Sequence, residues 1–251
     1  MAVTLEVDGV GKDFLIPVID SVSFDVEAGA FVCLLGPNGC GKTTLLRIVG
    51  GLEPPTHGRV LLGGEPVAGS GRHTKKVGVV FQEDRLLPWM TLRNNVELVL
   101  GPLGFDAKAR RATADRYLRL AGLAGFEDYY PARVSGGMRQ RAAIARALAI
   151  EPDLLLMDEP FGALDAQNRR IMQAEVRRMW RETGRTILFV THAIDEAVAI
   201  GTTLIMLSAR PSRICAEVRN DGHVERATLI DELNALIMRE VERQQGASST
   251  S

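Results

Sequence analysis

The stretch GPNGCGKTT (36–44) limits what this chain can fold into more than any other part of it, because it matches the pattern G-x-x-x-x-G-K-[ST]. It directly follows an apolar run typical of a buried strand, FVCLL (31–35), and it opens a segment with helical character, KTTLLRIVG (42–50). Glycines let successive backbone N–H groups curl around phosphate oxygens, and a helix that starts there adds its dipole. The sequence therefore predicts a nucleotide-binding loop between a strand and a helix.

Two side chains of this loop have specific expected roles. Lys42 would reach the β- and γ-phosphates, and Thr43 would place its hydroxyl on Mg²⁺. Cys40 lies near a helix N-terminus, which can lower the pKa of a thiol, so it is either a redox switch or, as we favour, a small residue that fits. The residues expected to contact the nucleotide here are Gly36, Pro37, Asn38, Gly39, Cys40, Gly41, Lys42, Thr43 and Thr44.

A second chemical signal is the apolar run LLLMDEP (154–160), which contains two adjacent acids. In α/β sheets, ligands bind at the carboxyl ends of strands, so such acids are well placed to act on a nucleotide. Asp158 could hold Mg²⁺, and Glu159 could orient and deprotonate an attacking water. Alone, an acidic pair of this kind is usually a solvated loop, but in a chain with a phosphate loop it predicts nucleotide hydrolysis.

The remaining apolar pattern predicts an α/β fold with a helical insert. Runs at 77–81 and 186–190 are almost wholly apolar, as in parallel strands covered on both faces, whereas 3–7 and 22–26 alternate like half-exposed strands. A further strand is expected at 202–208. Helical patterns are expected at 91–101, 106–123 and 138–150, and again where Leu229, Leu233, Leu236, Ile237 and Val241 recur. We expect one domain over 1–245, with a core formed by 1–83 and 151–220, a helical subdomain at about 84–150, a C-terminal helix at about 227–243 and a flexible tail at 246–251.

Composition excludes several classes of protein. A formal net charge of −1 gives no electrostatic reason to expect nucleic-acid binding. Three scattered cysteines predict neither a disulfide framework nor a zinc site. The first ten residues lack the basic and apolar regions of a signal peptide, and no run approaches the roughly 18 apolar residues of a membrane span. If a membrane is involved, a partner must supply it.

Six motifs occur in an order that resembles the ATP-binding subunit of an ABC transporter, over residues 3 to about 215. They are the phosphate loop, Gln82, VSGGMRQR (134–141), LLLMDEP, GALD (162–165) and THAIDEA (191–197). The resemblance implies a P-loop NTPase of ABC type, with a mostly parallel sheet core, an antiparallel β subdomain and an inserted helical subdomain. It also implies that the cofactors are ATP and Mg²⁺.

The resemblance assigns roles to further residues. Phe14 matches the aromatic residue that stacks on adenine, and Gln82 matches the glutamine that touches Mg²⁺ and the γ-phosphate. His192 matches the histidine that contacts the γ-phosphate and helps to hold Glu159, and Asp165 matches the acid of the loop that crosses to a partner subunit. The implied catalytic residues are Glu159, His192, Lys42 and Gln82, and the implied metal ligands are Thr43, Gln82 and Asp158.

The signature stretch VSGGMRQR explains why one chain has two candidate phosphate sites. In the family, two cassettes pack head-to-tail, so that Ser135, Gly136 and Gly137 of one chain would close over ATP held by the other. Hydrolysis would then remove the bridge and open the dimer. Met138 stands where the family usually has glutamine, and we expect the serine hydroxyl and the glycine amides to keep the main γ-phosphate contacts.

The chain has a single cassette, and QEDRLLPWMTLRNNV (82–96), DEPFGALDAQNR (158–169) and LSARPSRI (207–214) look most like the nitrate/sulfonate/taurine importer group. That likeness implies a homodimer, a separate membrane permease, a periplasmic or lipoprotein solute-binding protein, and a place at the cytoplasmic face of the inner membrane. The alternatives are an exporter subunit and a soluble ABC ATPase of DNA repair or translation. The soluble types carry a long coiled-coil insert or two cassettes, and this sequence shows neither.

The apolar residues within 84–96 allow two interpretations. Leu86, Leu87, Pro88, Trp89 and Met90 either form core of the helical subdomain or line a groove that receives a cytoplasmic helix of the permease. We favour the groove, because an apolar cluster with an aromatic anchor directly follows Gln82.

Overall fold

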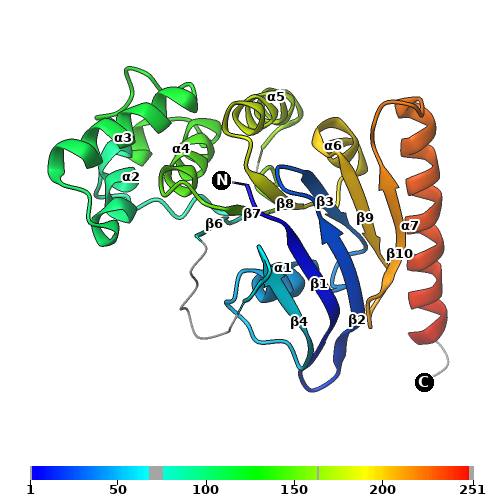
Figure 1. The fold of residues 1–251 in the computed structure, drawn as a ribbon. Helices are drawn as coiled ribbons and strands as arrows, with labels where there is room; N and C mark the ends of the chain where they lie inside the picture. The colour runs from blue at the N-terminus through cyan, green and yellow to red at the C-terminus, as the bar shows by residue number, and fades with distance from the viewer. Residues whose placement is uncertain (1, 68–75, 163, 249–251) are drawn as a thin grey trace. The chain divides into compact units, whose positions relative to one another are not determined.

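The computed structural model describes residues 2–67, 76–162 and 164–248 (Figure 1). The chain forms two compact units. The first consists of Met1–Lys75 and Thr186–Ser251, and the second of Lys76–Arg185. Each unit is described below by itself.

The first unit contains an antiparallel sheet in the order β2-β1-β4-β5. Its strands are β1 (Leu5–Asp13), β2 (Pro17–Val26), β4 (His57–Leu62) and β5 (Glu65–Pro66). In β1 and β2, buried and exposed side chains largely alternate, because one face of the sheet is covered. Gly58 has a φ of +77°, and a Cβ there would lie 2.2 Å from the carbonyl oxygen of Gly9, so only glycine fits where β4 passes β1.

The same unit contains four strands of a second sheet, in the order β10-β9-β3-β8. They are β3 (Phe31–Leu35), β8 (Thr186–Val190), β9 (Thr203–Leu207) and β10 (Ile214–Arg219). β3 runs parallel to both β8 and β9, and β10 is antiparallel to β9 at the edge. Every residue of β3 and β8 is buried, which explains why their sequences are apolar throughout.

The described residues of the first unit include the helices α1 (Lys42–Val49), α6 (Ile194–Ile200) and α7 (Arg226–Ser248). α1 contacts β8, and α6 contacts both β3 and α7. The buried side chains of Leu229 and Leu233 lie on α7, which Figure 1 shows as the long orange-to-red helix near the C-terminus. The predicted amphipathic C-terminal helix is thus present.

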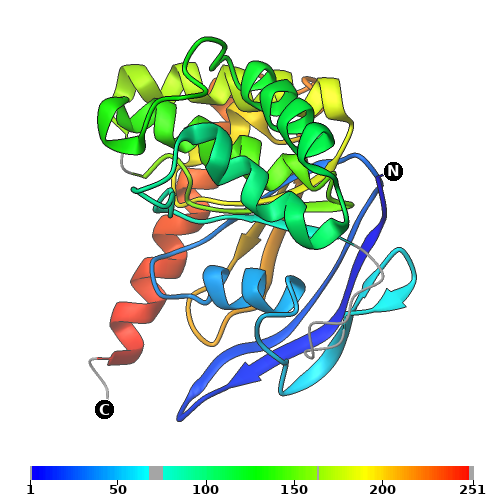
Figure 2. The same cartoon turned by 90° about the vertical axis from the view of Figure 1, so that its left-hand side faces the viewer.

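The second unit combines two parallel strands with a group of helices. The strands are β6 (Val77–Val80) and β7 (Leu154–Asp158), and the helices are α2 (Leu92–Leu100), α3 (Ala107–Leu120), α4 (Gly136–Ala149) and α5 (Ala166–Thr183), with short 3-10 turns at Gly101–Leu103 and Pro131–Arg133. α2, α3 and α4 pack against one another, and they form the green group of helices in Figure 2. Arg93 of α2, which is buried, pairs with Asp115 of α3 and with Asp128, and so ties this group together.

Polar side chains define the start of each long helix in this unit. Thr91, Asp106, Ser135 and Asp165 each accept a hydrogen bond from the backbone N–H three residues later, at the starts of α2, α3, α4 and α5. Such caps satisfy donors that have no partner within the helix. The cap at Ser135 explains why α4 begins at Gly136, two residues earlier than its apolar pattern indicates.

The structure bears out the predicted fold class and adds elements that the apolar pattern did not reveal. These are β4, β5, β10, α5 and α6. α7 continues to Ser248 and so includes 246–248, which the sequence reading assigned to the tail, whereas 249–251 lie outside the described residues. Within the described part of the chain, no helix is both long and apolar enough to cross a bilayer.

Candidate nucleotide-binding site

The phosphate loop occupies the turn between β3 and α1 in the first unit. Gly36, Gly39 and Gly41 have φ values of +154°, +77° and +110°, a region that other residues rarely adopt. A Cβ on Gly36 would lie 2.9 Å from both the Cys40 sulfur and the Leu207 carbonyl oxygen, so space as well as backbone conformation requires glycine there. The loop therefore takes the curled conformation that the sequence motif predicts.

The buried side chain of Lys42 holds the phosphate loop in this curled conformation. Its Nζ donates hydrogen bonds to the carbonyl oxygens of Gly36, at 2.8 Å, and Pro37, at 3.0 Å, and only 6% of the residue is exposed. The first turn of α1 contains no acid, so the positive end of the helix dipole and the Lys42 ammonium both make the loop electropositive. The loop is therefore a cationic cradle suited to phosphate oxygens.

Cys40 is a packed residue of the cradle. Its side chain is 1% exposed, and its backbone N–H donates to the Pro37 carbonyl at 3.3 Å. Burial raises the pKa of the thiol above its ordinary value, and the opposing effects of the Lys42 charge and backbone N–H are smaller. The helix start does act to lower this pKa, as expected, but burial outweighs it, so the geometry supports the interpretation of Cys40 as a small residue that fits.

Phe14 and His192 are the other predicted site residues of the first unit, and both are exposed. Phe14 follows β1 directly, and the ammonium of Lys12 lies 4.9 Å from the centroid of its ring. The outward ring offers a flat face of the kind that adenine stacks on. His192 lies in the loop between β8 and α6, and the residues on either side of it are held in place by hydrogen bonds.

Two residues that the sequence did not single out fix the loop of His192. The hydroxyl of Thr191 donates to the carboxylate of Glu196 at 2.6 Å and accepts from the backbone N–H of Ala193 at 3.0 Å. The backbone N–H of Thr191 donates to Leu34 in β3 at 3.2 Å. Thr191 and Glu196 are both buried, so they restrain the backbone on both sides of His192. The sequence analysis quoted both residues within the motif THAIDEA but gave them no role, because the motif alone does not show which side chains are buried and bonded to each other.

In the second unit, Asp158 is the last residue of β7 and Glu159 follows it with a φ of +44°. This left-handed conformation turns the chain sharply at the end of the strand, and the Glu159 carbonyl accepts from Gly162 N–H at 3.1 Å. Gln82 lies beside the same turn, since a Cβ on Gly162 would come within 3.2 Å of its side-chain nitrogen. The structure therefore brings together Gln82 and the Glu159 turn.

The signature stretch forms the start of α4. Ser135 Oγ accepts from the backbone N–H of Met138 at 3.3 Å. Among the described residues, a Cβ on Gly137 would meet nothing within 4 Å, and one on Gly136 would meet only the end of the Arg139 side chain, at 3.7 Å. Crowding within the chain therefore does not require glycine at these positions. Their effect is to leave the N-terminus of α4 without side chains that would cover it. The cap uses the backbone of Met138, so it does not depend on the side chain at this position.

Asp165 caps α5 and is tightly bonded to Asn168. It accepts from the backbone N–H of Asn168 at 2.9 Å and from its side-chain amide at 2.6 Å. These bonds lower the pKa of Asp165, which keeps the carboxylate charged. The residue is exposed at the surface of the second unit.

The predicted Mg²⁺ ligands have the right chemistry for that ion. Thr43, Gln82 and Asp158 offer a hydroxyl, an amide and a carboxylate oxygen, the donors that Mg²⁺ prefers, and Mg²⁺ usually relies on few protein ligands in addition to phosphate and water. The described residues contain no group of three or more histidines, cysteines or acids that could hold a metal alone. Thr43 belongs to the first unit, and Gln82 and Asp158 belong to the second.

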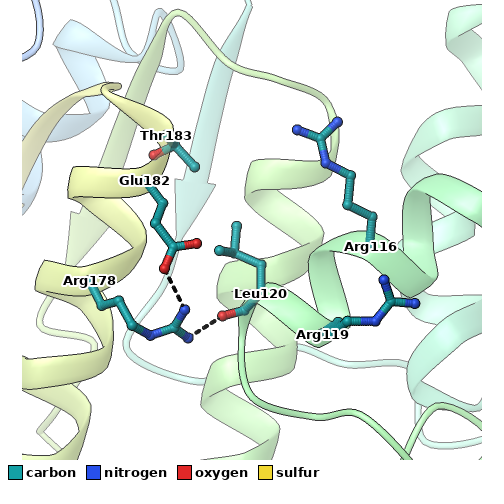
Figure 3. A pocket seen from close by; sticks show the side chains of 6 residues that line it. All are labelled: Arg116, Arg119, Leu120, Arg178, Glu182 and Thr183. Atoms are coloured by element: carbon teal, nitrogen blue, oxygen red, sulfur yellow. Dashed lines mark hydrogen bonds and ion pairs between the residues drawn. The ribbon is translucent and has the colours of Figure 1, made fainter.

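A separate pocket of about 350 Å³ lies in the second unit, near the ends of α3 and α5 (Figure 3). Its lining includes Arg178, which pairs with Glu182 at 2.8 Å and also donates to the Leu120 carbonyl oxygen. The bond to Leu120 joins α5 to the end of α3, whereas the pair with Glu182 lies within α5. The lining of the pocket includes none of the predicted site residues.

Comparisons with known proteins agree with this geometry. Residues 19–162 match the family described as ABC transporter. The chain is 45% identical over 226 residues to an uncharacterized ABC transporter ATP-binding protein of Methanocaldococcus jannaschii, covering 88% of this chain and 84% of that one. It is 49% identical over 198 residues to the taurine import ATP-binding protein TauB of Burkholderia pseudomallei, covering 79% of this chain and 75% of that protein.

Solved structures give the same result. The fold matches a dimeric post-hydrolysis ATP-binding cassette bound to ADP and Pi, with a TM-score of 0.75, 31% identity, and coverage of 87% of this chain and 99% of that one. A dimeric bacterial ABC transporter cassette matches with the same values. From the phosphate loop, the acidic end of β7 and these similarities together, we conclude that the chain belongs to the ABC transporter family, as an ATP-binding subunit that hydrolyses ATP.

Proposed function

We propose that this chain is the motor subunit of an ABC importer, which dimerises around two ATP molecules and drives solute uptake through a separate permease. The observation that carries the proposal is that one chain has two anion-binding geometries, the cradle around Lys42 and the bare start of α4 at Ser135. One nucleotide per chain needs both only if the second geometry serves ATP held by another copy. The dimeric form of the similar cassettes supports this arrangement.

The similarity to a taurine import ATP-binding protein, which extends over 79% of this chain, supports the proposed solute class. We infer an importer of the nitrate/sulfonate/taurine type, with a homodimer of this chain, membrane permease subunits and a periplasmic or lipoprotein solute-binding protein. The subunit would lie at the cytoplasmic face of the inner membrane, attached through the permease. The permease and the binding protein would select the solute.

Within each site, the residues have separable tasks. Phe14 would stack on adenine, and Lys42 would hold the β- and γ-phosphates inside the loop. Glu159 would take the proton of the attacking water, and His192 would orient the γ-phosphate from a loop fixed by Thr191. Bound Mg²⁺, held by Thr43, Gln82 and Asp158, would neutralise charge on the phosphates. Asp165 would contact the partner subunit.

The dimer would be held by donors that face γ-phosphate across the interface. Ser135 Oγ and the amides of Gly136 and Gly137 would supply them, as helix N-termini commonly do for phosphate. Hydrolysis would remove this bridge, so the dimer would be stable with ATP and open with ADP. This difference in stability is what would couple hydrolysis to movement of the permease.

The decisive experiment traps the ATP-bound dimer. The Glu159→Gln variant keeps the size of the side chain but cannot act as a base, so with Mg-ATP it should form a dimer that light scattering coupled to gel filtration detects. The matched control, Glu159→Gln with Lys42→Ala, should stay monomeric because the cradle loses its cation. If the Glu159→Gln variant remains monomeric in saturating Mg-ATP, and also fails to pair on a permease, the proposal is wrong.

The permease contact is proposed at the segment that follows Gln82. The side chain of Trp89 is 70% exposed, whereas Leu86 in the same segment is buried. The core interpretation is therefore correct for Leu86, and the exposed ring of Trp89 supports the groove interpretation. Trp89→Ala should lower transport while ATP hydrolysis by the isolated subunit persists, and equal loss of folding and hydrolysis would contradict the groove.

A further inference from the structure

The loop that follows Gln82 is attached to α4 by the side chain of Arg146. Its two terminal nitrogens donate to consecutive backbone carbonyls, that of Arg85 at 2.8 Å and that of Asp84 at 2.9 Å. A planar guanidinium fixes the direction of both carbonyls at once, which an ammonium cannot do. The far end of α4 therefore holds the backbone of this loop in a defined orientation.

A second arginine attaches the same loop to the other end of α4. Arg139 donates from Nε to the Asp84 carboxylate at 3.0 Å and from Nη1 to the carbonyl of Val134 at 3.2 Å. The other oxygen of the Asp84 carboxylate accepts from the backbone N–H of Leu86 at 3.0 Å. Val134 immediately precedes Ser135, so a short chain of contacts runs from the loop through Asp84 and Arg139 to the signature serine.

The backbone conformation of the loop is not one that the sequence of the loop favours by itself. Arg85 has a φ of +47°, and its guanidinium lies 3.9 Å from the centroid of the Phe81 ring. A non-glycine residue in this region is strained and persists only when its surroundings hold it. Gln140 of α4 adds another contact, donating to the Phe81 carbonyl at 3.4 Å.

Hydrogen bonds, more than tight packing, join the loop to the start of α4. A cavity of about 690 Å³ lies there, and its lining includes Gln82, Asp84, Gly136 and Arg139. Space of this size lets the loop shift, while the two arginines keep it connected to the helix.

From these contacts we propose that Asp84 and Arg139 are positioning residues that transmit movement of the loop after Gln82 to the start of α4, with Arg146 as the fixed point. When the loop moves, Arg139 moves the backbone of Val134 and therefore the donors at Ser135. The inference rests on the proposed function, since it gives Ser135 a nucleotide of a second copy to contact. It adds a physical link between the segment that would touch the permease and the residues that would close the dimer.

The test measures dimer formation in the Glu159→Gln background, where hydrolysis does not interfere. Asp84→Ala and Arg139→Ala should each raise the protein concentration for half-maximal ATP-dependent dimerisation by about fivefold, the order expected from loss of one charged hydrogen bond. Because both act through one contact, the double variant should lose no more than either single variant. Arg139→Lys, which can still pair with Asp84, should recover most of the loss.

Controls separate positioning from general damage. Arg133→Ala removes an exposed cation close to Ser135 that has no role in the proposed link, and it should dimerise like the parent. Binding of a fluorescent ATP analogue to the monomer, which depends on the cradle of the first unit, should stay within about twofold of the parent in every variant, since no cradle contact is altered.

The outcomes are distinguishable. If Glu159→Gln alone stays monomeric in saturating Mg-ATP and also fails to pair on a permease, the proposed function fails and this inference fails with it. If Glu159→Gln dimerises and the Asp84 and Arg139 variants dimerise at the same concentration, only the inference fails. It also fails if the losses multiply in the double variant, or if they follow an equal loss of nucleotide affinity.

Discussion

Backbone strain at Glu159 gives the sharpest test of how the structure places its candidate base. With a φ of +44°, Glu159 holds a left-handed conformation that costs a non-glycine residue about 1–2 kcal/mol, whereas glycine adopts it freely. Glu159→Gly and Glu159→Ala both remove the side chain, so they differ mainly in this strain. We expect the glycine variant to be more stable than the alanine variant by about 1 kcal/mol after the larger unfolded-state entropy of glycine is subtracted.

That difference corresponds to a melting temperature about 2–4 °C higher for Glu159→Gly, which differential scanning calorimetry of the two purified variants can resolve. The matched control is Arg170, an exposed residue within α5. There the glycine variant of the protein should instead be less stable than the alanine variant by about 0.5–1 kcal/mol. Both Glu159 variants should lose ATP hydrolysis. An alanine variant as stable as the glycine variant, or more stable, would refute the reasoning that the base is held in a strained turn.

Three further outcomes follow from contacts described above. Ser135→Ala should lower the free energy of unfolding by about 1 kcal/mol through loss of the cap of α4 and should weaken ATP-dependent dimerisation, whereas a parental dimer would contradict its role. Thr191→Val should lower the free energy of unfolding by about 1–3 kcal/mol, because buried Glu196 loses a hydrogen bond of 2.6 Å. Thr191→Ser should restore that free energy, and chemical denaturation measures it for both variants. Burial raises the pKa of Cys40, so iodoacetamide near neutral pH should label the exposed Cys215 first. Cys40 should react appreciably only as the pH rises toward its raised pKa, when the thiolate forms. Mass spectrometry measures both labelling rates, and equal rates would contradict this prediction.

Buried strands and most of the long helices were predictable because their patterns depend on local burial, but α5 was not. The runs at 31–35 and 186–190 coincide with β3 and β8, since strands covered on both faces need apolar residues throughout. β4 and β10 escaped prediction because they are largely exposed or alternate, and their polar residues hide the pattern. The apolar pattern of α4 begins only at 138, because the glycines at 136 and 137 add no apolar side chain, and the Ser135 cap marks the start of the helix.

The local conformation of the candidate site was predictable where a motif dictates its own backbone. The glycines of the phosphate loop predicted a curled turn, and the structure shows that turn, with Lys42 bonded to Gly36. What the sequence could not provide was the support beneath the motif residues, such as the hold of Thr191 and Glu196 on the loop of His192. The direction of the Cys40 pKa shift could not be judged either, because proximity to a helix start is visible in the sequence and depth of burial is not.

The division of the chain into two units has a consequence for how the energy of ATP is controlled. Lys42 and its cradle belong to one unit, and Glu159 with Gln82 belongs to the other. Under the roles proposed above, binding the phosphates and activating the attacking water are therefore tasks of different parts of the polypeptide. We therefore expect a single subunit to keep ATP bound in the cradle while hydrolysing it more slowly than the assembled dimer does.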